Sequence, residues 1–255
     1  MAVKESAVAG NQSVSYIVKQ AQSVAYAALD LLFPPRCVIC RRVGQELCAS
    51  CVDDFRPVGD SICRSCGEPR AVPGLCGRCA AHPPAYKGIR SAYRFDGGMR
   101  KAIHVLKYNH RRGLAIPLAE AAAQRLPSPG PAAVICPVPL YPARQAERGY
   151  NQARLLAVEL ARCWGLICLP EEALRRIRPT NSQVGLDHDA RQSNVRGAFS
   201  AEPSLVGGAI ILLVDDVCTT GATMNSCAEA LLAAAAVSVV GVTLARATSD
   251  ARPDR

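Results

Sequence analysis

The chain has 255 residues, of which 49% are hydrophobic, 20% are charged and 5% are aromatic. This apolar content excludes an intrinsically disordered chain, and the length predicts one or two globular domains with a sizeable core. The longest aliphatic run, residues 209–214, falls far short of the ~20 apolar residues of a membrane-spanning helix, so we expect no membrane span. The net charge of +9 favours anionic partners such as phosphates or nucleic acids.

The N-terminal segment carries a helical pattern. Apolar residues recur at helical spacing from 14 to 32, and Pro34-Pro35 ends the pattern, so residues 1–35 are predicted to form a helical segment. Lys4 and Lys19 interrupt the apolar residues there, and the segment does not resemble a secretion signal. We therefore expect a cytoplasmic protein.

Four Cys-x-x-Cys pairs follow between residues 37 and 79. They comprise Cys37, Cys40, Cys48, Cys51, Cys63, Cys66, Cys76 and Cys79. A two-residue spacer lets both sulfurs of a tight turn face one tetrahedral ion, and two such turns complete a closed Cys₄ zinc site. The pattern predicts a double zinc ribbon over residues 36–82 that holds two structural Zn²⁺ ions.

The spacing of these cysteines leaves two questions open. A disulfide framework is the alternative to zinc, but it needs an oxidising compartment and nothing in the sequence indicates secretion. Two ions can also be shared among the four pairs in sequential or interleaved order, and the spacing allows both arrangements.

Beyond Pro83-Pro84 the pattern changes to apolar strands that alternate with helices. Strands are expected at residues 89–95, 132–136, 209–214 and 237–244, and helices from residue 97 and at 114–126, 151–164 and 222–236. This alternation predicts an α/β fold over residues 86–248, with a mostly parallel sheet covered by helices on both faces. Residues 249–255 are expected to form a tail.

The segment 210–223 places unusual chemistry at the carboxyl end of a strand, where such sheets bind ligands. An apolar strand leads to Asp215 and Asp216, and a loop with Thr219 and Thr220 turns at Gly221 into a helix. Backbone N–H groups at the start of that helix form a nest for phosphate. Two carboxylates beside the nest suit the hydroxyls of a ribose, or Mg²⁺. The segment therefore predicts a site for a ribose 5-phosphate.

This segment resembles the phosphoribosyl pyrophosphate (PRPP) motif of type I phosphoribosyltransferases, and the whole arrangement resembles the ComF family. The matching stretches are Leu31–Cys37, Leu106–Tyr108, Pro137–Leu140, Arg148–Gln152, Thr180 with Gln183, Arg191, Asn194 and Gly197–Phe199. The resemblance implies a type I phosphoribosyltransferase-like sheet preceded by the zinc ribbon. It also implies that residues 175–196 form the mobile loop that closes over such sites.

The resemblance assigns a PRPP site by position. It implies that Asp215 and Asp216 are the catalytic carboxylates that hold the ribose hydroxyls and that residues 219–223 cradle the 5-phosphate. It also implies that Pro137–Leu140 ends a strand and that the loop after it binds the pyrophosphate of PRPP with Mg²⁺. The implied PRPP-binding residues are Asp215, Asp216, Val217, Cys218, Thr219, Thr220, Gly221, Ala222, Thr223, Leu140, Arg144 and Arg148.

Two functions of different classes follow. In the first, the protein is a phosphoribosyltransferase, although no segment resembles a hood that recognises an acceptor base. In the second, the PRPP site is only a ligand or regulatory pocket, and the protein binds single-stranded DNA through Lys107, Arg111 and Arg112. The ComF resemblance implies a role in DNA uptake during natural transformation, with a DNA-uptake helicase as partner.

Overall fold

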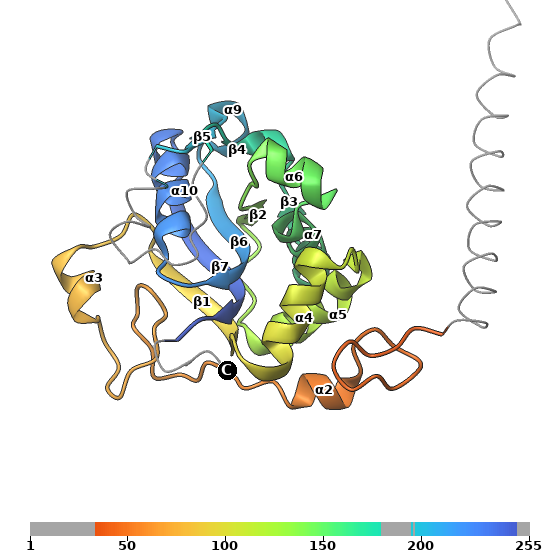
Figure 1. Ribbon diagram of the computed structural model, residues 1–255. Helices are drawn as coiled ribbons and strands as arrows, with labels where there is room; N and C mark the ends of the chain where they lie inside the picture. Colours follow the sequence, from red (N-terminus) through yellow and green to blue (C-terminus); the bar gives the residue numbers. More distant parts are fainter. Residues whose placement is uncertain (1–33, 180–194, 196, 249–255) are drawn as a thin grey trace, which may run out of the picture. The chain divides into compact units, whose positions relative to one another are not determined.

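A computed structural model describes residues 34–179, 195 and 197–248 (Figure 1). The expected N-terminal helical segment, most of the expected mobile loop and the tail lie outside these described residues. The chain divides into two compact units, Met1–Cys48 and Ala49–Arg255. The second unit contains the last two cysteine pairs together with the whole α/β fold.

The second unit is built around a five-stranded parallel sheet. Its strand order is β1 (Gly88–Arg94), β7 (Ser238–Arg246), β6 (Ile210–Cys218), β2 (Ala133–Pro137) and β3 (Ile167–Cys168). The parallel sheet predicted from the alternation of strands and helices is confirmed. All four strands expected from apolar runs are present.

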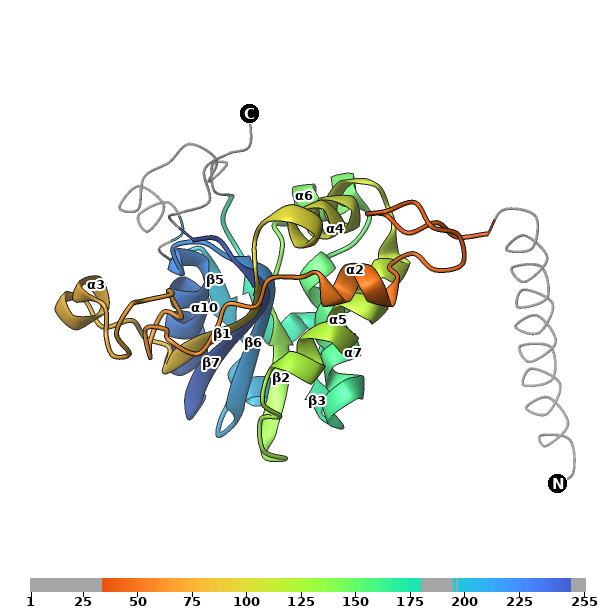
Figure 2. The same ribbon diagram turned by 90° about the horizontal axis from the view of Figure 1, so that it is seen from below.

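Helices cover both faces of this sheet (Figures 1 and 2). Helices α5 (Ala115–Arg125) and α7 (Gln152–Trp164) lie on one face, and α10 (Ala222–Ala233) lies on the other. Helix α4 (Gly97–Tyr108) follows β1 and buries Met99, among others, as its apolar spacing predicts. Burying apolar stripes of this kind on both faces removes the sheet from water and stabilises the domain.

Several shorter elements were not expected from the sequence, because they span too few residues to show a period. They are α2 (Ala49–Asp53), α3 (Gly77–Ala81), α6 (Pro142–Arg148), α9 (Pro203–Val206), the 3₁₀ turns Arg112–Leu114 and Glu171–Ala173, and the antiparallel pair β4 (Leu174–Arg176) and β5 (Phe199–Ala201). Within the described ranges, no helix combines the length and apolarity needed to cross a membrane.

Strand β6 is longer than the sequence predicts. It continues to Cys218 instead of ending near Val214, because β7 pairs with it as far as the Cys218–Arg246 register. Asp215 lies opposite Thr243 in this ladder. The two adjacent carboxylates are therefore held by strand geometry and not by a loop.

Candidate functional site

Asp215 and Asp216 have different partners although they are neighbours. Asp216 is 2% exposed, forms an ion pair with the Nζ of Lys107 from α4, and accepts a hydrogen bond at 3.0 Å from the Nε2 of Gln152 on α7. Asp215 instead accepts the backbone N–H of Asp216 at 2.8 Å. Three elements thus converge on Asp216, which fixes the orientation of its carboxylate.

The environment moves the pKa values of the two carboxyls in opposite directions. Burial raises the pKa of Asp215 well above its usual range, and the neighbouring charge of Asp216 adds to this effect. Burial also works against ionisation of Asp216, but the Lys107 ammonium lowers the pKa of Asp216 below its usual value. The pair therefore carries one strongly held negative charge and one group that takes up a proton more easily.

A chain of hydrogen bonds connects Asp216 to the loop that follows β2. Arg148, the last residue of α6, donates from Nη1 to the Oε1 of Gln152 at 2.5 Å, while the same amide donates to Asp216. The Arg148 guanidinium also stacks 5.2 Å from the ring centroid of Tyr108. The side chain of Gln152 therefore couples Asp216 electrostatically to an anion that binds near Arg148.

Residues 219–223, called here the β6 loop, connect β6 to α10. Gly221 has a φ of +83°, and a Cβ at this position would lie 2.8 Å from the Oη of Tyr86, so both the backbone and the space require glycine. The hydroxyl of Thr220 accepts the N–H of Ala222 at 3.3 Å. The positive end of α10 begins at this turn, which suits an anionic ligand.

Residues 138–150, called here the β2 loop, lie at the carboxyl end of the neighbouring strand. The Nδ2 of Asn151 donates to the carbonyl of Val138 at 3.0 Å, and the N–H of Val138 donates to the carbonyl of Val214 at 2.8 Å. These bonds join the base of the loop to β6. Helix α6, within the loop, buries none of its residues, and Arg144 is exposed on it.

A pocket of about 290 Å³ flanks the β2 loop. Its lining residues are Cys136, Pro137, Pro139, Leu140, Pro142, Gln145, Asn151, Pro170, Glu171, Glu172, Leu174, Arg175, Arg176 and Ile177. Neither Asp215 nor Asp216 lines this pocket, and Leu140 is the one expected PRPP residue that does. The pocket therefore does not include the two carboxylates.

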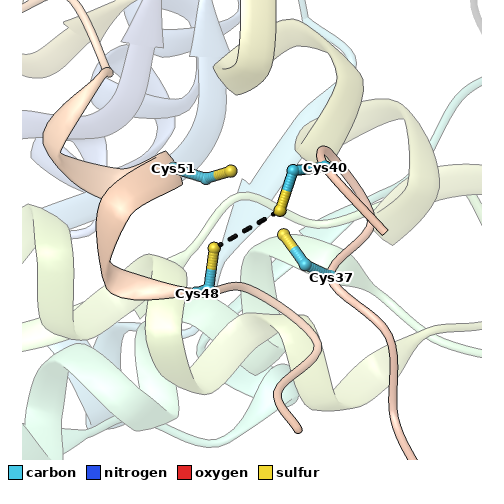
Figure 3. A group of neighbouring side chains, drawn as sticks. All are labelled: Cys37, Cys40, Cys48 and Cys51. Carbon is cyan, nitrogen blue, oxygen red and sulfur yellow. Dashed lines mark hydrogen bonds between the residues drawn. The ribbon is translucent and has the colours of Figure 1, made fainter. Parts of the chain in front are cut away.

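The eight paired cysteines form two separate groups. Cys37, Cys40, Cys48 and Cys51 form one group, with their sulfurs turned toward one another (Figure 3), and Cys63, Cys66, Cys76 and Cys79 form the other. Within each group all four sulfurs lie within 4.8 Å of one another. The grouping is sequential, which resolves the alternative that the spacing left open.

The sulfur geometry of both groups fits zinc. A tetrahedral Zn²⁺ with Zn–S bonds of about 2.3 Å holds its sulfurs about 3.8 Å apart. The Cys40–Cys48 and Cys66–Cys76 sulfur distances are 3.6 and 3.8 Å.

Backbone donors prepare the sulfur of Cys63 for metal binding. Burial works against ionisation of Cys63, but backbone N–H groups, that of Cys76 among them at 3.3 Å, lower the pKa of its thiol to about 6. A thiol with this pKa provides the thiolate that zinc requires.

Both the cysteine-rich part and the α/β part of the chain match known protein families. Residues 28–80 match the double zinc ribbon domain, and residues 169–255 match the phosphoribosyl transferase domain. The chain is 33% identical over 221 residues to the DNA utilization protein YhgH of Salmonella typhimurium, covering 82% of this chain and 96% of that protein. The chain belongs to the ComF family.

Two further relatives carry names from natural competence. Competence protein F of Haemophilus influenzae is 32% identical over 209 residues, covering 77% of this chain and 90% of that protein. Competence protein ComFC of Bacillus subtilis is 27% identical over 235 residues, covering 88% of this chain and 90% of that protein. This ComF-family chain is thus a competence or DNA utilization protein with a phosphoribosyltransferase-like domain.

The three basic residues expected to contact DNA occupy different environments in this ComF-family protein. Lys107 points to Asp216 and is part of the carboxylate cluster. Arg112 is exposed, donates from Nη2 to the carbonyl of Gly149 at 2.8 Å and stacks 4.9 Å from the ring centroid of Tyr150. Arg111 is exposed beside it. The DNA role of all three stays a prediction.

The sequence gives no indication of the roles of three side chains near the site. Gln152 bridges Arg148 and Asp216, and Tyr86 backs the turn at Gly221. Arg176 ends β4 over the ring of Phe199, and burial lowers its pKa. Gln152 lies within a stretch that resembles the ComF family, but nothing in the sequence places its amide on an aspartate of another element.

Proposed function

We propose that this ComF-family protein binds PRPP with Mg²⁺ and uses it as a phosphoribosyl donor in the handling of DNA. The observation that carries the proposal is the direct succession of Asp215, Asp216 and the β6 loop at the carboxyl end of a parallel strand. A 5-phosphate on the loop would bring the ribose hydroxyls to the carboxylates, which are acceptors for both hydroxyl protons.

The rest of the site suits the pyrophosphate end of PRPP. Arg148 and the exposed Arg144 offer cationic groups on the β2 loop, the second loop at this edge of the sheet. Asp215 and Asp216 would be the residues that hold Mg²⁺, which would supply positive charge to the departing pyrophosphate. Lys107 balances the charge of Asp216, so the carboxylate pair with its lysine repels an anionic ligand less than two free carboxylates would.

The supported reaction is substitution at C1 of the ribose. A nitrogen of an acceptor base forms the C1–N bond, the C1–O bond breaks, and pyrophosphate leaves with the bonding electrons while the base nitrogen loses its proton. The carboxylates hold the ring through its hydroxyls as positive charge develops at C1, and the cations stabilise the leaving group.

The proposal is tested by calorimetric titration of the zinc-loaded protein with PRPP and Mg²⁺. Asp215→Asn combined with Asp216→Asn should abolish the binding, because the ribose then loses both carboxyl groups that would hold its hydroxyls. The matched control is Asp53→Asn combined with Asp54→Asn, an adjacent acidic pair that is exposed at the end of α2. The proposal is overturned if the intact protein does not bind PRPP. It is also overturned if the Asp215/Asp216 variant binds PRPP as well as the intact protein does.

A second function rests on an exposed aromatic side chain. Tyr108 is 59% exposed, stacks with Arg148, and precedes the exposed Arg111 and Arg112. Exposed aromatic rings among cations bind single-stranded nucleic acid by stacking and by neutralising phosphates. We therefore propose single-stranded DNA as a second ligand of this surface.

Variants of this surface separate the two ligands. Arg111→Ala combined with Arg112→Ala should flatten the salt dependence of oligothymidine binding, measured by fluorescence anisotropy, and spare PRPP. Lys107→Met should weaken PRPP binding, because Lys107 pairs with Asp216, and should also flatten the salt dependence of DNA binding if Lys107 contacts DNA as predicted. Arg125→Ala combined with Arg162→Ala on α5 and α7 provides the control of equal charge. DNA binding that is unchanged in the Arg111/Arg112 variant contradicts this second role.

A further inference from the structure

Arg246 is a fully buried arginine at the end of β7. Its Nη1 donates to the carbonyl of Cys66 at 2.7 Å, and its Nη2 lies 2.5 Å from the Oε2 of Glu68. The same Nη1 lies 2.7 Å from the Sγ of Cys218, which ends β6. One guanidinium thus joins a zinc-ligating turn to the strand that leads into the β6 loop.

The turn around the Cys63–Cys66 pair is also joined to the sheet through its backbone. The N–H of Ile89 in β1 donates to the carbonyl of Ser65 at 2.8 Å, and Arg90 donates from Nη1 to the carbonyl of Arg64 at 3.1 Å. A Cβ at Gly67 would lie 2.7 Å from the carbonyl oxygen of Ile89. This contact leaves the turn little freedom to move relative to β1.

The linker between this ribbon and β1 also contacts the β6 loop. Tyr86, 5% exposed, places its hydroxyl against the turn at Gly221. The neighbouring N–H of Ala85 donates to the Oδ1 of Asn225 in the first turn of α10 at 2.7 Å. The β6 loop is therefore contacted by the Ala85–Tyr86 linker and follows a strand end that Arg246 holds through Cys218.

We propose that Arg246 is a positioning residue that transmits the order of the second zinc site to the β6 loop. Zinc at Cys63, Cys66, Cys76 and Cys79 fixes the carbonyl of Cys66 and the backbone before Glu68. These two acceptors fix Arg246, and Arg246 fixes the end of β6. The inference rests on the proposed function, because the ligand of the β6 loop is taken to be the 5-phosphate of a ribose.

The proposal predicts reciprocal coupling between the metal and the phosphate. If zinc at the second site strengthens ribose 5-phosphate binding by a given factor, ribose 5-phosphate must strengthen zinc binding there by the same factor. A coupling of roughly 10- to 100-fold is the usual size for two sites joined through a packed network. Pyrophosphate, which is expected on the β2 loop, should show no such coupling.

The test uses the zinc-loaded protein and three variants, titrated calorimetrically with ribose 5-phosphate and separately with Mg²⁺-pyrophosphate. Arg246→Met should weaken ribose 5-phosphate binding roughly 10- to 100-fold and leave pyrophosphate binding within about twofold. Cys218→Ala, which deletes only one sulfur, should give a smaller loss of the same kind. Arg162→Met, which removes an exposed arginine with two glutamate partners, is the control.

A second readout follows zinc itself. The rate at which a coloured chelator removes the second ion should fall when ribose 5-phosphate is present, and Arg246→Met should abolish that protection while the chain still binds two zinc ions. Equal loss of ribose 5-phosphate and pyrophosphate binding in Arg246→Met would reduce Arg246 to a general folding role and overturn the proposal.

The variants distinguish failure of the Arg246 proposal from failure of the proposed function. If Arg246→Met does not fold, Cys218→Ala decides, and unchanged ribose 5-phosphate binding in that variant overturns the proposal. If the unaltered protein binds neither PRPP nor ribose 5-phosphate, the proposed function fails first. Binding by the unaltered protein with no effect of either variant leaves the proposed function standing and removes Arg246 from it.

Discussion

The two loops at the carboxyl edge of the sheet are held in different ways. The β6 loop is packed from behind: its turn at Gly221 is buried against Tyr86, and the strand before it is joined to Arg246. The β2 loop carries α6 with no buried residue, and side-chain hydrogen bonds through Gln152 and Asn151 connect it to the strands. One loop is preorganised by packing, whereas the other can adjust to its ligand.

The strongest test of this contrast is Gly221→Ala in the β6 loop. The positive φ and the contact with Tyr86 together should displace the turn and weaken ribose 5-phosphate binding roughly 100-fold. Gly165→Ala is the matched control, since Gly165 also has a positive φ, +66°, but open space around it. Calorimetric titration of both variants measures the difference, and equal behaviour would show that packing behind the turn is irrelevant.

Substitutions of Asp215 and Asp216 should also have different effects on stability, because Asp216 connects to the β2 loop through Gln152 and Asp215 does not. Asp216→Asn leaves the Lys107 ammonium without its partner and should lower the free energy of unfolding by about 3 kcal/mol at neutral pH. This deficit should shrink as the pH falls below about 4, because the depressed pKa of Asp216 stabilises the fold only while the group is ionised.

Asp215→Asn should behave oppositely. The raised pKa of Asp215 means that the folded protein prefers its protonated form, and this stabilising contribution is lost as the pH rises through the folded-state value. The variant should therefore gain stability relative to the unaltered protein as the pH increases from about 4. Urea unfolding at several pH values measures both variants, and parallel pH profiles would contradict the assignment.

Gln152→Leu tests the connection of the β2 loop directly. It removes both hydrogen bonds of the amide, to Arg148 and to Asp216, and should weaken PRPP binding roughly 10-fold through the loss of buried hydrogen bonds. Ribose 5-phosphate binding should change less, because the β6 loop is untouched. Gln124→Leu, an exposed position on α5, is the control.

The smallest effect is expected for Arg144→Ala. This arginine is exposed on α6, so its interaction with pyrophosphate is screened by solvent, and a loss of about threefold in PRPP affinity is expected. The loss should disappear at high salt, because mobile ions screen such a charge. A loss that persists in high salt would place Arg144 in a closed site and remove the contrast between the loops.

The sequence predicts the frame of the fold because apolar runs and helical periods are long in β6, β7, α7 and α10. It does not predict α6 or the β4–β5 pair, which are too short for a period to show. Spacing identifies the eight cysteine ligands but not their grouping, since sequential and interleaved sites use the same turns.

The contacts between distant segments are the part that sequence reasoning cannot supply. The sequence marks Asp216 and Lys107 separately, one as a ribose ligand and one as a DNA contact, and only the fold brings them together. Arg246 carries no signal at all in the sequence, because its partners Cys66 and Glu68 belong to the zinc ribbon. Pairing across so many residues depends on strand order, which local patterns do not encode.

The contact between Arg246 and Glu68 also sets an order of events during synthesis. It joins residues 178 positions apart, so nearly the whole unit must leave the ribosome before it can form. The ribbon can bind zinc as soon as its own cysteines emerge, whereas β7 is the last strand made and inserts between β1 and β6. Until then β1 has no strand that joins it to β6, so the sheet is completed only when the last of its five strands pairs with both.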